Sequence, residues 1–183
     1  MTIVFAFDKL APFAILNTSW HADWVSVYGS TLETRVRYIP SDVAETFPFP
    51  TSLDALESIG ERYDSHRRDI MVARREGLTA TYNRFHSKHE VSHDIATFRA
   101  LHVEMDHAVA AAYGWTDLDL GHGFHQTKQG IRYTLSEAAR RTVLDRLLAL
   151  NHERYAAEQS EAAAAPRPKA KPRKRTPAQP DLF

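Results

Sequence analysis

The chain has 183 residues, an apolar fraction of 43% and no cysteine, which excludes disulfides and thiolate metal sites and is compatible with a cytoplasmic location. No apolar run approaches the roughly 20 residues of a membrane-spanning helix, so we expect no membrane contact. The net charge is zero, but residues 161–183 contain six Lys/Arg and two Asp/Glu, so residues 1–160 carry a net negative charge. This negative charge argues against tight, autonomous binding of nucleic acid by the folded part.

The N-terminal part of the chain predicts a strand followed by one helix. Residues 3–7 (I-V-F-A-F) are a compact apolar run with β-branched and aromatic character, which is typical of a strand. A strand there has few visible partners, so we expect that the upstream part of a domain is missing. From Pro12 to Val27, apolar residues at three- and four-residue spacing predict a single helix that ends at Gly29.

Two tryptophans lie on one face of this predicted helix. Trp20 and Trp24 are four residues apart, so their indoles are neighbours on the helix surface. We interpret them as packed anchors of the core, because indoles bury large apolar areas. Stacking on a nucleic-acid base is the alternative.

The stretch from residue 34 to residue 50 combines a short strand with an apolar corner. Residues 34–38 alternate polar and branched side chains, which predicts a strand with Arg35 and Arg37 on one face. The two arginines form either a solvated strand face or a contact for phosphate or a guanine edge, which the planar guanidinium favours. Residues 47–50 (F-P-F-P) predict a rigid wedge that seats the helices that follow.

Three helices are predicted after this corner. Their apolar periodicity and capping residues place them at residues 52–77, 95–112 and 134–155, with Gly114 as the glycine that ends the second. Residues 78–94 show no clear period and predict a connecting loop, and residues 117–133 predict irregular structure with glycine turns. From about residue 160 the composition turns to Ala, Pro, Lys and Arg, which predicts a disordered basic tail.

Ten histidines raise the question of a metal site. On the second predicted helix, His102 and His107 are separated by about 500° of rotation and therefore diverge. With no cysteine and no H-E-x-x-H, metal binding is the weaker interpretation. The G-H-G-F-H run at residues 121–125 predicts either a tight turn or a close backbone approach to a partner.

The chain lacks the sequence motifs of several common enzyme classes. It has no G-x-x-x-x-G-K phosphate loop, no G-x-G-x-x-G after a strand and no G-x-S-x-G nucleophile turn. We therefore expect no catalytic residues and no activity in this isolated chain. An intact small enzyme that uses the histidines is the less favoured possibility.

Two long segments carry a family resemblance: F-A-I-L-N-T-S-W-H-A-D-W-V-S-V-Y-G-S-T-L-E-T-R-V-R-Y-I-P-S-D-V-A-E-T-F-P-F-P (residues 13–50) and L-H-V-E-M-D-H-A-V-A-A-A-Y-G-W-T-D-L-D-L-G-H-G-F-H-Q-T-K-Q-G-I-R-Y-T-L-S-E-A-A-R-R-T-V-L-D-R-L-L-A-L-N-H-E-R-Y (residues 101–155). They resemble the C-terminal part of large bacterial DNA methyltransferases, the MmeI-like single-chain restriction–modification and phage-defence enzymes. The resemblance covers nearly everything from residue 3 to about residue 158.

The resemblance implies an upstream Rossmann-like domain that binds S-adenosylmethionine, carries an Asn-Pro-Pro-Tyr type motif and methylates adenine at N6 after flipping the base. This chain has neither that motif nor a cofactor loop, so it would bind no cofactor itself. The implied fold class is mainly α. A short α/β remnant of a DNA target-recognition domain (residues 1–50) precedes a three-helix C-terminal domain (51–159) and a disordered basic tail (160–183).

The implied partners are double-stranded DNA and the upstream methyltransferase catalytic portion. A module that docks a separate methyltransferase or nuclease chain without touching DNA is the alternative. The candidate DNA contacts are Arg35, Arg37, Tyr38 and Ser41, with Lys128 and Arg132 as secondary candidates.

The last five residues, Q-P-D-L-F, resemble the short peptide by which bacterial proteins bind the replication sliding clamp. Gln179, Leu182 and Phe183 match that peptide, whereas Pro180 departs from its usual leucine. Leu182 and Phe183 would fill an apolar pocket while the tail supplies reach. The alternative is a frayed end with a basic linker that holds DNA loosely.

Overall fold

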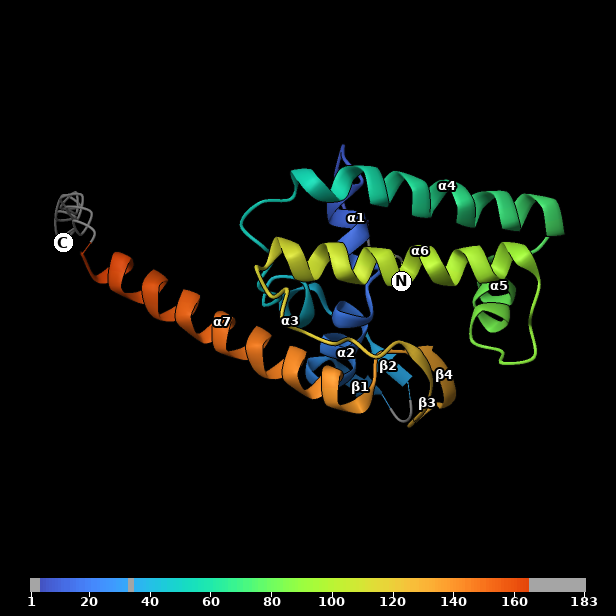
Figure 1. The fold of residues 1–183 in the computed structure, drawn as a ribbon. Coiled ribbons are helices and arrows are strands. Elements are labelled where there is room, and N and C mark those ends of the chain that lie inside the picture. Colours follow the sequence, from blue (N-terminus) through green and yellow to red (C-terminus); the bar gives the residue numbers. More distant parts are fainter. Residues whose placement is uncertain (1–3, 33–34, 165–183) are drawn as a thin grey trace, which may run out of the picture.

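The computed structural model describes residues 4–32 and 35–164, with the backbone alone for residues 31, 32, 35 and 36. The described chain is mainly helical, as predicted, with two small antiparallel hairpins (Figure 1). The elements in chain order are α1 (Ala11–Leu16), α2 (Ser19–Tyr28), β1 (Ser30–Leu32), β2 (Arg35–Arg37), α3 (Pro40–Val43), the 3-10 helix η1 (Asp54–Leu56), α4 (Glu57–Arg74), α5 (Leu78–Phe85), α6 (His93–Ala112), β3 (Gly123–Thr127), β4 (Gly130–Thr134) and α7 (Glu137–Ala164).

Helices α4 and α6 pack side by side, and α4 lies along one edge of the fold (Figure 1). Tyr63 of α4 and Phe98 of α6 are both fully buried, with ring centroids 4.9 Å apart. Helix α1 packs on α4, and the Glu57 carboxylate accepts the backbone N–H groups of Leu10 and Ala11 at 3.0 and 2.8 Å. A side chain distant in sequence therefore satisfies the free donors at the start of α1.

The end of α6 follows the prediction in detail. Gly114 has φ +75°, and its N–H donates to the carbonyl of Ala111. The N–H of Trp115 donates to the carbonyl of Ala110 at 2.9 Å, which completes a Schellman motif. Glycine is favoured at this position because a left-handed φ costs it nothing.

The single helix predicted over residues 12–27 is two helices, α1 and α2. Thr18 has extended backbone angles between them, and its hydroxyl donates to the carbonyl of Ile15 and accepts from the N–H of His21. Threonine hydroxyls compete with helical hydrogen bonds and are favourable caps. The apolar stripe continues across this break, which explains why periodicity alone predicts one helix.

Three further predictions are wrong in part. Residues 4–7 form no strand, since no described strand lies beside them to complete a ladder. The predicted 78–94 loop contains α5, whose buried side consists of only Thr81 and Phe85 and gives too short a period to recognise. The predicted irregular segment 117–133 contains most of the β3–β4 hairpin.

The last helix is longer than predicted. Helix α7 begins at Glu137 and continues to Ala164, beyond the expected start of the tail at residue 160. Its buried residues are Ala139, Val143 and Leu147, and its C-terminal turns extend away from the other helices (Figure 1). Among the described helices, none has both the length and the apolar character required to cross a bilayer.

The buried apolar side chains form one core cluster that includes residues on both sides of position 50. Phe47 lies in this core, with its ring 5.8 Å from Trp24 in an edge-on arrangement. The predicted boundary at residue 50 therefore lies inside one packed unit. That it also marks the end of a recognition domain stays a prediction.

Candidate nucleic-acid interface

The β1–β2 hairpin carries the first candidate residues. The strands pair antiparallel, with Ser30 opposite Arg37 and Leu32 opposite Arg35, so the two arginines share one face. Arg37 is exposed, whereas the Arg35 side chain lies outside the described part of the structure. The predicted strand at residues 34–38 is thus confirmed over Arg35–Arg37, and its partner β1 was not predicted.

Tyr38 holds this hairpin to α2. Its hydroxyl lies 2.9 Å from Nε2 of His21, and the two ring centroids are 5.8 Å apart. Burial lowers the pKa of His21 to about 4 and raises the pKa of Tyr38, so the pair is neutral near pH 7. The Tyr38 hydroxyl is therefore engaged inside the protein, which favours a positioning role over a direct contact with DNA.

Ser41 and Ser30 both bind an acidic residue. Their hydroxyls donate to the two carboxylate oxygens of Asp42, each at 3.0 Å. Asp42 lies in the first turn of α3, where a negative charge is favourable. Because Ser30 is also the strand partner of Arg37, this carboxylate lies near the arginine face. The surface is therefore of mixed charge.

Lys128 and Arg132 lie on the other hairpin. Lys128 is exposed in the turn between β3 and β4, and Arg132 is half-buried on β4 opposite His125. The positive charge of Arg132 adds to burial in lowering the pKa of His86 to about 4. Across the described residues, no hydrogen bond or ion pair joins Lys128 or Arg132 to the Arg37–Ser41 group. Lys128 and Arg132 belong to a different hairpin from Arg37.

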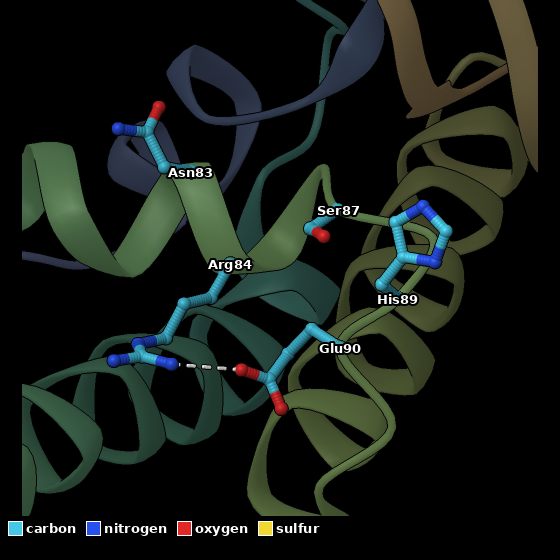
Figure 2. A pocket seen from close by; sticks show the side chains of 5 residues that line it. All are labelled: Asn83, Arg84, Ser87, His89 and Glu90. Atoms are coloured by element: carbon cyan, nitrogen blue, oxygen red, sulfur yellow. Dashed lines mark hydrogen bonds and ion pairs between the residues drawn. The ribbon is translucent and has the colours of Figure 1, made fainter.

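Two surface hollows contain none of the candidate residues. Figure 2 shows the first, of about 310 Å³, in which Arg84 is directed toward Glu90. Arg84 lies 2.9 Å from both Glu76 and Glu90, so its charge is balanced within the protein. The lining residues are Asn83, Arg84, Ser87, His89 and Glu90. The second hollow lies between Asp8 and Glu57 and is lined mainly by acidic and apolar residues.

A buried polar network connects α2, α4 and α6. Asp106 is fully buried, and its carboxylate accepts the N–H of Ser19 at 3.1 Å and lies 2.8 Å from Nε2 of His122. His102 lies 3.1 Å from the Ser19 hydroxyl through Nε2 and 3.2 Å from the Tyr63 hydroxyl through Nδ1. Burial lowers the pKa of His102 although the nearby Asp106 opposes the change, so the ring is neutral near pH 7.

This network contains the residue types of a hydrolytic triad without its geometry. In such a triad the acid orients the histidine through Nδ1, but here Nδ1 of His102 faces Tyr63. Asp106 instead holds the backbone of Ser19, and the serine is almost completely buried. We interpret the network as a polar part of the core that fixes the start of α2 against α6.

Sequence reasoning missed Asp106 and Ser19, although one signal was available. Asp106 follows His102 by four residues and Phe98 by eight, so it falls on the buried face of α6. An acid within an apolar stripe indicates a buried partner, because an unpaired buried charge is costly.

The remaining candidates give no site among the described residues. His102 is buried and His107 is exposed, so the two diverge as expected. In the described part of the chain, no three His, Asp or Glu side chains are grouped so that they could hold a metal ion. The clamp-peptide candidates Gln179, Leu182 and Phe183 lie outside the described residues.

Comparison with known proteins gives no match to a protein-family model, to a curated protein or to a solved structure.

Proposed function

We propose that the chain is the DNA-recognition and scaffold part of an S-adenosylmethionine-dependent, adenine-specific (N6) DNA methyltransferase of a restriction–modification or phage-defence system. The catalytic portion, with its cofactor, would be supplied by a separate or upstream segment. The proposal rests on the resemblance of residues 13–50 and 101–155 and on one structural observation.

That observation is the way in which the helical part holds the apolar corner. Two backbone carbonyls of the corner, and that of the residue before it, accept hydrogen bonds from side chains far along the chain. Asn151 donates to Thr46 at 2.6 Å, the Tyr113 hydroxyl donates to Pro48 at 2.9 Å, and Arg154 donates to Phe49 at 2.6 Å. These carbonyls would otherwise need solvent or other donors, so the contacts make the corner part of the helical body.

Because the corner is held in place, the β1–β2 hairpin, which carries Arg35 and Arg37, is held in place too. Helix α3 connects β2 to the corner, and its Val43 is fully buried in the core. The Tyr38–His21 hydrogen bond ties the same hairpin to α2. The exposed Arg37 is therefore presented from a rigid support, as positioning contacts to phosphate require.

Duplex DNA binding across a salt series tests this proposal. We would measure the full chain alone and together with the catalytic portion of a methyltransferase from the resembled family, using a fluorescein-labelled duplex of mixed sequence. We expect affinity to fall linearly with salt on a logarithmic scale, because bound cations release counterions from phosphate. Absence of salt-dependent binding in both arms would overturn the role in DNA recognition.

A second candidate function is a docking module for a separate methyltransferase or nuclease chain. It is favoured by exposed apolar side chains, which include Val4, Phe7 and Tyr155. Co-purification with the catalytic portion in the absence of DNA, combined with no DNA binding, would select this function. Salt-dependent DNA binding by the chain alone would reject it as the sole role.

A further inference from the structure

We propose that the β3–β4 hairpin is the element that enters the major groove of duplex DNA, with Lys128 at its tip and Gln126 on its groove-facing side. This inference rests on the proposed function and deepens it, because it names the contacting element. It also changes the ranking of the candidates, since Lys128 was a secondary one.

The β3–β4 hairpin is positively charged, whereas the folded part as a whole is negatively charged. Residues 120–136 contain Lys128 and Arg132 and no Asp or Glu, although residues 1–160 have a net charge of −4. The β1–β2 region, by contrast, carries Asp42 beside the strand that holds Arg37. Within residues 1–160, a polyanion is therefore better matched to the β3–β4 hairpin than to the β1–β2 region.

Four arginines of α4 are less suitable, because acids pair with them. Arg74 pairs with Asp94 at 2.7 Å, and Arg62 pairs with Glu104. Arg67 and Arg68 both pair with Asp64. A cation that already has a carboxylate partner must lose that partner to bind phosphate, so these positions offer less net attraction.

The β3–β4 hairpin is a regular two-stranded ribbon. Its strands pair in antiparallel register from Gly123 opposite Thr134 to Thr127 opposite Gly130, which leaves Lys128 and Gln129 as the turn. Gly130 has φ +98°, a value that closes a tight hairpin and that L residues rarely adopt. The major groove of B-DNA admits a two-stranded ribbon of this kind.

One face of the ribbon presents groups that read bases. Gln126 and Ile131 lie opposite each other near the tip of this face and are both exposed. Phe124 and Tyr133 continue the same face at the base of the ribbon, where Arg99 covers their rings. A glutamine amide can pair with the N6 and N7 edge of adenine, and apolar side chains contact the thymine methyl group. The Gln126 amide nitrogen donates to the neighbouring carbonyl of Thr127 at 3.1 Å, and its side chain is exposed.

The base of the ribbon is held firmly while its tip projects. The Arg99 guanidinium lies over the rings of Phe124 and Tyr133, at 5.1 and 5.6 Å from their centroids. Tyr133 also packs edge-on against Phe85. A ribbon that is ordered before binding loses less conformational freedom when DNA docks, which favours affinity.

Arg99 is itself fixed by the end of α5 and the loop that follows it. Its guanidinium donates to four backbone carbonyls at 2.8 to 3.1 Å: those of Arg84, Phe85, Ser87 and Glu90. The loop, α6 and the ribbon base thus form one support. Arg99 acts as a positioning residue for the ribbon, since its guanidinium donates to backbone carbonyls.

Site-directed photocross-linking tests the proposal directly, because the chain has no cysteine. The variant Gln129→Cys, labelled with a benzophenone maleimide, places a cross-linker at the ribbon tip. The matched control Arg68→Cys places it on α4, where the side chain is 68% exposed. Both variants keep the basic tail, so any difference between them reports the position of the hairpin. The probe is the mixed-sequence duplex, with its isolated strand as a comparison.

We expect cross-linking to the duplex from the tip to exceed that from α4 several-fold. We also expect protection of guanine N7, a major-groove atom, from dimethyl sulfate in the wild-type complex, and loss of that protection in Lys128→Gln. The slope of log affinity against log salt should fall by about one in Lys128→Gln and be unchanged in Arg68→Gln.

The possible failures are distinguishable. Equal cross-linking from the tip and from α4, with wild-type DNA binding intact, would overturn the ribbon proposal and leave the proposed function standing. Cross-linking only to the isolated strand would also overturn it, in favour of base stacking. No DNA binding by any variant, alone or with the catalytic portion, would overturn both.

Discussion

The hydroxyl of Tyr113 donates a 2.9 Å hydrogen bond to the carbonyl of Pro48 and so joins the end of α6 to the apolar corner at residues 47–50. The same ring stacks on Trp20 and Trp115, with centroids 5.6 and 4.6 Å away. Tyr113 therefore connects the segment that carries the β1–β2 hairpin to the helices that support this hairpin.

Replacing Tyr113 with phenylalanine removes the hydrogen bond and keeps the stacked ring. We expect the free energy of unfolding to fall by about 1 kcal/mol, the usual net value of such a bond, with some extra cost for the unpaired carbonyl. Urea unfolding followed by tryptophan fluorescence measures this change. The control Tyr155→Phe alters an exposed ring on α7 and should leave stability unchanged. Equal stability of both variants would mean that the corner is not held by this contact.

The buried network around Asp106 makes a second prediction. Asp106→Ala removes the acceptor of the Ser19 N–H and the partner of His122, so about 3 kcal/mol of stability should be lost. Glu104→Ala, two residues earlier on α6, removes an exposed ion pair with Arg62 and should cost less than about 1 kcal/mol. Thermal unfolding of the two variants compares them. A similar small loss in both would contradict a structural role for the network.

Acid should destabilise the protein through histidines whose pKa is lowered by burial, namely His21, His86 and His102. Burial lowers the pKa of His21 and of His86 to about 4, below the usual value near 6.5. Stability from their neutral forms is therefore complete above about pH 6.5 and is lost as pH falls toward 4. Each histidine contributes up to about 1.4 kcal/mol per pH unit in that window. Urea unfolding at pH 7 and pH 5 measures the loss, and His86→Gln should reduce the pH dependence.

The elements that were predicted well are those whose sequence pattern is complete within a few neighbouring residues. The burial of Phe98 and Met105 on α6 follows from their spacing, and Gly114 ends the helix because only glycine adopts its φ without cost. The strand at Arg35–Arg37 and the apolar corner were likewise visible in the alternation of side chains and in the prolines. Each of these patterns is complete within a few residues.

The elements that were missed depend on distant partners. Helix α5 is stabilised by the packing of Phe85 on Phe98 and Tyr133, and the loop after it is held by Arg99. The β3–β4 ribbon likewise rests on Arg99 through its aromatic rings. No local periodicity encodes such contacts. For the same reason the engagement of the Tyr38 hydroxyl by His21 could not be foreseen.

Arg37 provides a prediction for the β1–β2 hairpin. If Arg37 contacts phosphate, Arg37→Ala should weaken duplex binding uniformly across sequences and reduce the salt slope by about one. Arg68→Ala removes an exposed arginine of α4 and should change neither quantity. Fluorescence anisotropy at several salt concentrations measures both. Unchanged affinity in Arg37→Ala would assign this residue to a solvated strand face.

Methyl transfer to adenine N6 tests the central claim most directly. Labelled S-adenosylmethionine, duplex DNA and a catalytic portion from the resembled family would be incubated with and without this chain. We predict sequence-dependent adenine methylation only when both components are present, and none from this chain alone. Methylation by this chain alone, or equal methylation by the catalytic portion without it, would contradict its assignment as the recognition and scaffold part of such an enzyme.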